Sequence, residues 1–218
     1  LASAGSEVLQ SRAVEFAKNY GVVLEVLSSF VVKPGTLVRE EDEEMEQMII
    51  RGIAADKNQA KATLLGVPDT PGVAARIFKS LAGANINVDM IVQNVSAAGV
   101  TDVSFTVAKD DINKTKRTIE PLVREIKAAG LNFDGDIAKV SIVGVGMKSH
   151  SGVAYRMFEV LAANRINIEM ISTSEIKISV AIRAKDADQA VRALHDAFGM
   201  GEAPKKKAPA KKKAAKKK

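Results

Sequence analysis

The chain has 218 residues, enough for one large domain or two small ones, and 46% of them are hydrophobic, as in ordinary globular proteins. The absence of cysteine excludes disulfides and thiolate zinc sites, and it favours a cytoplasmic location. No apolar run approaches the length of a membrane span, and no signal-peptide pattern is visible. Because the first residue is Leu1 rather than methionine, we expect the chain to begin partway through a longer reading frame.

The positive charge is concentrated at the C-terminus. The net charge is +6, but residues 201–218 hold nine lysines and one glutamate, which leaves a net charge of −2 for residues 1–200. A low-complexity basic segment repels itself, so we predict a disordered Lys-rich tail over 201–218. The tail is interpreted as solubilising, with non-specific contact to nucleic acid or an acidic partner as the alternative. The near-neutral remainder argues against nucleic-acid binding by the folded part.

An internal duplication dominates the sequence. Residues 72–91 (GVAARIFKSLAGANINVDMI) and 152–171 (GVAYRMFEVLAANRINIEMI) share eleven of twenty aligned positions without a gap. Two copies are too few for a solenoid, so we expect a pair of small domains packed against each other. The duplicated pattern is a Gly-led helix followed by a strand, which is typical of a binding module rather than of a catalytic motif.

The N-terminal elements differ from the repeats. The residue pattern predicts a helix over 3–19 and a strand over 22–30, and Pro34 and Gly35 predict a turn. The acidic run at residues 40–44 is interpreted as a linker.

Each repeat reads as a βαββαβ unit. In the first unit we expect strands at 59–67, 87–95, 100–107 and 131–133, with helices at 72–84 and 112–129. Pro71 suits the first turn of the earlier helix, and Gly130 is expected to end the later one as its C′ residue. In the second unit we expect strands at 138–145, 167–174 and 176–182, with helices at 152–164 and 187–198.

The second unit lacks a final strand, while a predicted strand over residues 47–55 precedes the first unit and has no place in it. We expect this strand to complete the second unit, because pairing removes an open sheet edge and an unpaired strand together.

Four strings resemble the tandem ACT domains in the regulatory half of the aspartate kinase family. They are GVPDTPGVAARIF (66–78), INVDMIVQNVS (86–96), AKVSIVGVGMKSHSGVAYRMFEVL (138–161) and INIEMISTSEIKISV (166–180). The resemblance implies an α+β fold with two ferredoxin-like ACT domains packed as a tandem pair. The implied division is the end of an amino-acid-kinase α/β domain with an acidic linker (1–44), a first ACT domain (45–136), a second ACT domain (137–200) and the tail (201–218).

The resemblance names an enzyme family, but the kinase machinery is missing. The family binds ATP, with Mg²⁺, and aspartate mostly in its N-terminal kinase domain, and no P-loop appears here. Its closing helix carries a Leu-His-Pro-Arg-like string, of which only Leu9 and Arg12 match. We therefore expect these residues to be non-catalytic and to hold no cofactor or metal of their own. Some family members have a second, smaller subunit that starts at an internal methionine, the place of Met45 or Met48 here.

ACT pairs bind a free amino acid at the seam between units, so the resemblance implies a site for lysine, threonine or both. Such binding would feedback-control aspartate phosphorylation in lysine, threonine and methionine biosynthesis. The helix that begins at Gly72 offers unpaired N–H groups and a positive dipole end to a carboxylate. Asp69 could pair with an ammonium group, or it could be an ordinary loop acid. Asn87 is likewise a ligand candidate or a turn residue.

The second copy differs where specificity would arise. Its loop carries Lys148 and His150 instead of an acid, and its carboxylate-rich strand suits a cationic side chain such as lysine. Arg165 replaces Asn85, which favours lysine over threonine as effector, and His150 could equally be a surface residue. The predicted effector-binding residues are Asp69, Gly72, Val73, Ala74, Asn87, Val88, Asp89, Gln93, Met147, Ser149, His150, Gly152, Val153, Ala154, Asn167, Ile168, Glu169, Ser174 and Glu175.

The expected partners follow from the same resemblance. Each unit, of roughly 70 residues, is small for an independent core, so we expect a homodimer through the ACT units. Association with a catalytic aspartate kinase subunit is a further expectation, and no membrane partner is expected. Methionines 90, 147, 157 and 170 are interpreted as core residues rather than site residues.

Overall fold

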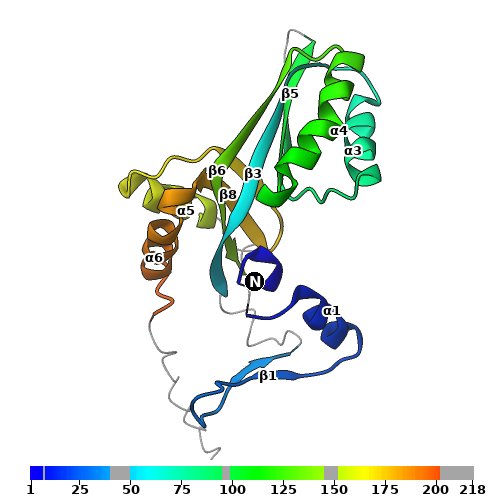
Figure 1. The fold of residues 1–218 in the computed structure, drawn as a ribbon. Helices are drawn as coiled ribbons and strands as arrows, with labels where there is room; N and C mark the ends of the chain where they lie inside the picture. The colour runs from blue at the N-terminus through cyan, green and yellow to red at the C-terminus, as the bar shows by residue number, and fades with distance from the viewer. Residues whose placement is uncertain (7, 40–49, 95–98, 145–151, 202–218) are drawn as a thin grey trace, which may run out of the picture.

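The computed structural model describes residues 1–6, 8–39, 50–94, 99–144 and 152–201. Its centre is a six-stranded antiparallel sheet in the order β4-β5-β3-β6-β8-β7 (Figure 1). The strands are β3 (Gly52–Pro68), β4 (Ile91–Gln93), β5 (Val100–Val107), β6 (Gly130–Val143), β7 (Met170–Thr173) and β8 (Lys177–Arg183). The helices beside them are α3 (Val73–Gly83), α4 (Ile112–Glu125), α5 (Val153–Ala163) and α6 (Ala187–Ala197), with short 3-10 turns η2 (Lys109–Asp111) and η4 (Ala184–Asp186).

The two longest strands, β3 and β6, each belong to both units. Residues 52–56 of β3 pair with 139–143 of β6, and farther along β3 residues 61–65 pair with 130–134 of β6. The expected strands at 47–55 and 59–67 are therefore joined into one strand, as are those at 131–133 and 138–145. Residues 52–56 of the early strand pair with β6 beside the second unit, as expected. The strand begins at Gly52, so Ile50 and Arg51 precede it, and residues 47–49 lie outside the described residues.

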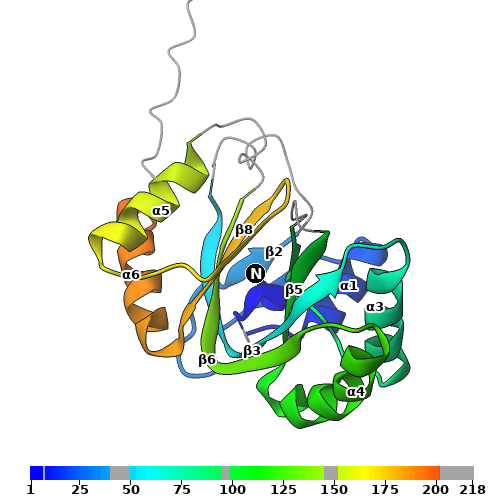
Figure 2. The same cartoon turned by 90° about the horizontal axis from the view of Figure 1, so that it is seen from above.

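Each unit pairs two helices with its own part of the sheet. Here the first unit is α3, α4, β4, β5 and the adjoining parts of β3 and β6, and the second is α5, α6, β7, β8 and the other parts of the same two strands. The two views show the α3–α4 pair and the α5–α6 pair on opposite sides of the molecule, with the strands between them (Figures 1 and 2). The predicted pair of ferredoxin-like units is confirmed, and they share one continuous sheet.

Both cores consist mainly of aliphatic side chains that recur at the same places in each unit. The helices that follow Gly72 and Gly152 bury Val73, Ile77 and Leu81 in one unit and Val153, Met157 and Leu161 in the other. The first core adds an edge-on contact of Phe78 and Phe105, whose ring centroids lie 5.8 Å apart. Met90, Met157 and Met170 are buried, which confirms that they are core residues, and Met147 lies outside the described residues.

Several predicted boundaries were wrong, for local reasons. The helix expected over 112–129 ends at Glu125, and the left-handed residue after it is Lys127, with φ of +58°, rather than Gly130. Gly130 instead pairs with Leu65 as the first residue of β6. The strand expected over 87–95 is regular only over Ile91–Gln93, because Asp89 and Met90 bond to Thr106 outside the ladder.

The N-terminal segment is less regular than predicted. It contains η1 (Ala2–Ala4), α1 (Ser11–Asn19) and a two-stranded sheet of β1 (Leu24–Val26) and β2 (Thr36–Val38). The helix expected from residue 3 begins at Ser11, because Gly5 adopts φ of +112° and interrupts the helical path. Residues 1–6 lie against the start of β3, where the Leu1 side chain covers Gly52 and Ala4 is buried. The predicted linker at residues 40–44 lies outside the described residues.

Residues 8–38 expose an unusual number of apolar side chains for a folded protein. The exposed members are Val8, Phe16, Tyr20, Val22, Val23, Leu27, Phe30, Val31, Val32 and Leu37. Phe30 and Val32 are essentially fully accessible, at 96% and 106%. Exposed apolar side chains in such number are a feature of interaction surfaces. None of the helices in the described part of the chain has the length and apolar character that a membrane span requires.

Because β3 and β6 run through both units, we predict that the units unfold as one cooperative structure. Leu64 and Ile142 are fully buried in the first and second core respectively, and truncating either to alanine is expected to cost about 2–5 kcal/mol. Amide hydrogen exchange should show that Leu64→Ala and Ile142→Ala each lower protection in both β5 and β8. Lys116→Ala, on the exposed face of α4, is the control. Loss of protection confined to the substituted unit would contradict a shared transition.

Candidate functional site

A hollow of about 440 Å³ lies at the mouth of α3 in the first unit. Its walls are the end of β3, the loop from Pro68 to Gly72, the first turn of α3 and the side chain of Gln93 from β4. Five predicted effector-binding residues line it, namely Asp69, Gly72, Val73, Ala74 and Gln93. The structure therefore brings together the acid, the helix start and the amide that the sequence assigned to one site.

The helix start in this hollow is arranged to receive an anion. Gly72 is the N-cap residue with φ of +92°, a left-handed conformation, and no side chain caps α3. The N–H of Val73 makes only a long bond of 3.3 Å to the carbonyl of Thr70. The first N–H groups of a helix lack partners within it, and the helix dipole adds positive potential there. A carboxylate in the hollow would meet both, while Asp69 in the same wall supplies a negative charge.

The second unit repeats the helix start, and only part of its predicted site can be described. Gly152 is again a left-handed N-cap, with φ of +96°, ahead of an α5 that no side chain caps. Val153 and Ala154 follow it as in the first unit, whereas Met147, Ser149 and His150 lie outside the described residues. Ser174 and Glu175 lie in the turn between β7 and β8, where the N–H of Ser174 donates to the carbonyl of Lys177 at 2.7 Å.

The remaining predicted residues lie outside the hollow. Asn87 and Asn167 are exposed, and Val88 and Ile168 pack against the cores of their own units. Asp89 and Glu169 face the seam, which is the region where Lys61 and Lys139 of the long strands meet the acids of the opposite unit. The chain becomes a regular strand only at Ile91, and Gln93 lines the hollow whereas Asp89 pairs with Lys139 at the seam.

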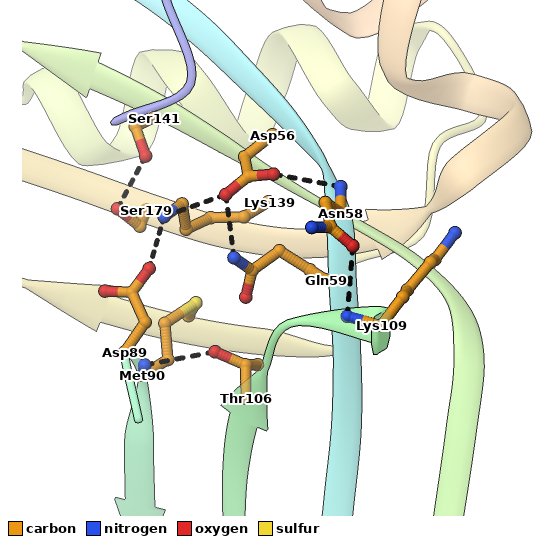
Figure 3. A network of polar contacts seen from close by, with 10 residues as sticks. All are labelled: Asp56, Asn58, Gln59, Asp89, Met90, Thr106, Lys109, Lys139, Ser141 and Ser179. Carbon is orange, nitrogen blue, oxygen red and sulfur yellow. Dashed lines mark hydrogen bonds and ion pairs between the residues drawn. The ribbon is translucent and has the colours of Figure 1, made fainter. Parts of the chain in front are cut away.

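Among the described residues, three ion pairs cross from one unit to the other, and two of them join a lysine of one unit to an acid of the other. Lys139 of the second unit pairs with Asp89 of the first, and Lys61 of the first unit pairs with Glu169 of the second. The two lysines occupy matching positions in the strings AKATLLGV (60–67) and AKVSIVGV (138–145), and the two acids match in the duplication. Figure 3 shows Lys139 between Asp56 and Asp89. Sequence reasoning missed both lysines, although the alignment of these two strings would have indicated them.

Lys139 is the most deeply buried charged group of the seam. Its side chain is only 2% exposed, and its second carboxylate partner is Asp56, 3.7 Å away. Asp56 also accepts hydrogen bonds from the backbone N–H of Asn58 at 2.9 Å and from the side-chain amide of Gln59 at 2.7 Å. Next to it, the hydroxyls of Ser141 and Ser179 lie 2.8 Å apart. Burial of a charge on this scale is tolerated only where it is paired and hydrogen-bonded.

The Lys61–Glu169 pair is part of a longer row of alternating positive and negative side chains. Glu169 also accepts from Nε of Arg183 at 2.8 Å, and Arg183 donates to Asp134 at the same distance. Burial alone would raise the pKa of the Asp134 carboxyl, but the backbone N–H of Asp136 and the Arg183 guanidinium together hold it below its ordinary value. Asp134 in turn raises the pKa of Arg183. Asp134 and Arg183 are therefore charged together around neutral pH.

A larger hollow, of about 600 Å³, separates residues 5–6 from β3 and α6. Its charged groups are Lys57, Asp188 and Arg192, of which Lys57 and Asp188 form an exposed ion pair at 2.8 Å. The hydrogen bond from Lys57 lowers the pKa of Asp188. The acid of this hollow, Asp188, lies in the first turn of α6 and is already paired with Lys57, so the hollow fits an amino acid less well. Within the described ranges, no cluster of three or more histidines, aspartates or glutamates could hold a metal ion.

Comparison with known proteins agrees with this geometry. Residues 63–121 and 140–198 both match the sequence profile of the ACT domain. The aspartate kinase of Pseudomonas fluorescens (strain SBW25) is 58% identical over 199 residues, which make up 91% of this chain and 48% of that protein. The chain thus spans about half the length of the curated relatives that it matches.

Two solved structures of aspartate kinases have a similar fold, and one of them is a regulatory subunit. The ligand-free regulatory subunit of aspartate kinase from Thermus thermophilus has a TM-score of 0.66 and 45% identity, over 69% of this chain and 99% of that one. Escherichia coli aspartokinase III in complex with lysine and aspartate has a TM-score of 0.66 and 26% identity, over 91% and 44% of the two chains. The chain therefore belongs to the ACT-domain family, as the tandem-ACT regulatory region of an aspartate kinase.

Proposed function

We propose that this chain binds free lysine, threonine or both in its ACT units and thereby feedback-controls the ATP-dependent phosphorylation of aspartate to 4-phosphoaspartate. The observation that carries the proposal is the hollow at α3, in which an uncapped helix start and Asp69 lie in one wall. An α-amino acid carries a carboxylate and an ammonium group a few ångströms apart. The hollow offers a complement to each of them.

The chemistry of the hollow supports an amino acid over other small ligands. Its volume of about 440 Å³ suits a ligand of this size, and Gln93 adds one amide that can both donate and accept. The solved complex of Escherichia coli aspartokinase III contains lysine, which supports a lysine site in a relative of this chain. Threonine remains a second candidate, because the hydroxyl of its side chain could bond to Gln93.

A second site in front of α5 is part of the same proposal. Gly152, Val153 and Ala154 provide the helix start, and Ser174 and Glu175 are assigned as its strand-side contacts. Met147, Ser149 and His150 complete the assignment. Asp89 and Glu169, with their neighbours Asn87, Val88, Asn167 and Ile168, take a direct effector role only if the lysine pairs of the seam open.

The exposed apolar face of residues 8–38 supports a kinase partner. We propose that this face packs against the body of a kinase domain, in the same polypeptide or in a catalytic subunit. That body would bind ATP with Mg²⁺ and aspartate, and the present chain would be non-catalytic by itself. A cytoplasmic location, in which free amino acids are the regulated pool, is part of this proposal.

The alternative function is interaction through the Lys-rich tail with nucleic acid or an acidic partner. The tail, over 202–218, lies outside the described residues. Calorimetric titration separates the two functions, because amino-acid binding in a hollow is saturable and tolerates salt, whereas binding to a polyanion weakens steeply as salt rises.

We predict that Asp69→Ala loses effector affinity without losing stability. If Asp69 neutralises the ammonium of the bound amino acid, its removal leaves that charge unpaired in a partly desolvated hollow, and the affinity should fall roughly thirty-fold or more. The melting temperature should change little, because an exposed loop acid contributes little to folding. Isothermal titration with lysine and with threonine, alongside thermal unfolding, measures both quantities.

Asp110→Ala is the matched control for this experiment. Asp110 is another exposed acid of the first unit that precedes a helix, and it does not line the hollow. Full-strength binding by Asp69→Ala would show that Asp69 is only a loop acid. A drop in melting temperature that accompanies the loss of binding would assign Asp69 to folding instead.

We predict that the chain dimerises through its ACT units. The outer strands β4 and β7 stand at the two ends of the sheet order and expose the apolar side chains of Ile91, Val92 and Ile171. Sedimentation at micromolar concentration should give twice the chain mass of 23.2 kDa. Ile91→Lys should shift the equilibrium towards monomer, whereas Lys79→Glu on the exposed face of α3 should not. A parent chain that sediments as a monomer with and without effector would contradict the prediction.

A further inference from the structure

We infer that the crossed pairs Lys61–Glu169 and Lys139–Asp89 form a latch that fixes the angle between the two units. We infer further that a ligand in the hollow at Asp69 acts on the second unit by displacing Asp89. The first statement stands on the seam alone, and the second rests on the proposed function.

The backbone alone does not set the angle between the units. The pairing of β3 with β6 shifts register twice, between Asp56 and Gln59 and between Gln59 and Lys61, at the point where one unit passes into the other. Irregular pairing of this kind bends and twists a strand locally. Two long strands with a shared irregularity can flex there, so the orientation of the units needs a second constraint.

The crossed pairs lie at this point and supply that constraint. Each lysine extends from a long strand of its own unit to an acid on the segment that precedes the outer strand of the other unit. A rotation of one unit against the other would separate both pairs at once. Beneath them, Met90 and Met170 pack with Ile137 and Ala181 in a small apolar cluster shared by the two units.

Each pair joins a buried group to one that reaches solvent. Lys139 is 2% exposed and its partner Asp89 is 34% exposed, whereas Glu169 is 9% exposed and its partner Lys61 is 22% exposed. Both buried members have a second partner, which is Asp56 for Lys139 and Arg183 for Glu169. Either pair can therefore separate without leaving a buried charge unpaired, as a reversible contact requires.

Only residues 90–92 separate the hollow from the latch along the chain. Gln93 lines the hollow, and Asp89 precedes it on the same segment, with Met90 held to Thr106 by a hydrogen bond of 3.1 Å between them. A ligand that draws Gln93 inward moves β4 and with it the carboxylate of Asp89. The second unit then loses one of the two lysine–carboxylate pairs that cross the seam.

The absence of cysteine allows a direct measurement of the angle. Lys79 on α3 and Asp196 on α6 are exposed helix residues in different units, so Lys79→Cys with Asp196→Cys can carry a pair of nitroxide labels. Pulsed electron–electron double resonance then gives the distribution of distances between the two labels, one on each unit. Diluting the labelled chain in excess unlabelled chain removes distances between copies.

Lys139→Met in the labelled chain should shift and broaden the distance distribution. Lys61→Met should do the same to a smaller degree, since Glu169 retains Arg183. Lys57→Met is the matched control, because it removes a lysine of β3 whose partner, Asp188, belongs to the same unit as that part of the strand. Distributions for Lys139→Met and Lys61→Met that match the control would overturn the latch. Should Lys139→Met fail to fold by circular dichroism, Lys61→Met decides the question.

The effect of a ligand on the distance between the labels is measured on the same labelled chain, with saturating lysine and then with saturating threonine. The expected result is a shift of the mean distance that follows the titration heat and is absent from Asp69→Ala. Binding heat without a shift would overturn the displacement of Asp89. No heat with either amino acid would overturn the proposed function and this displacement with it, while the comparison of lysine variants still decides the latch.

Discussion

The sharing of β3 and β6 between the units is the constraint on which the rest of the molecule depends. A βαββαβ unit normally closes with its own last strand, but here the second unit takes its closing strand from the chain that enters the first. The two units therefore cannot be separated without breaking a sheet. Any change of their arrangement must be a twist at the irregular pairing around Gln59, and the seam side chains lie at that place.

The duplication fixes what the two units have in common and leaves their loops free to differ. In both units a left-handed glycine, Gly72 or Gly152, precedes a helix that no side chain caps. An alanine at either position would be strained, because L-residues rarely adopt such a φ. The two helix starts are thus alike, and the groups beside the first of them include Asp69 and Gln93.

Elements with a strong local pattern were predicted correctly from the sequence. Predictions were wrong where contacts with residues distant in sequence determine the secondary structure. Helices α3 and α5 followed from apolar spacing, and the vacancy in the second unit followed from counting strands. The fusion of two strands across Asp56 and Gln59 could not be predicted, because polar residues there read as a loop while the ladder with β6 holds them extended. Gly130 was predicted to end a helix, but it pairs with Leu65 as the first residue of β6.

The candidate site divides in the same way. Asp69 and the helix start at Gly72 were predictable as one site, because both belong to the same short loop, Pro68 to Gly72. Asp89 and Glu169 read as free acids suited to a cationic ligand, since their partners lie 50 and 108 residues away in sequence. Only the pairing of each acid with the lysine of the other unit shows that the cation is already supplied by the protein.

The choice of charged groups for this seam has a physical consequence. A well-packed apolar seam of the same volume would hold the units together at least as firmly, because desolvation offsets much of the attraction in a buried ion pair. It would also hold them at many neighbouring angles, since apolar contact has little directionality. Two crossed lysine–carboxylate contacts that must be kept together restrict the angle more than either would alone. A solvent-reaching partner lets each contact be exchanged for water. The seam is therefore suited to defining an angle that can be changed, rather than to maximal stability.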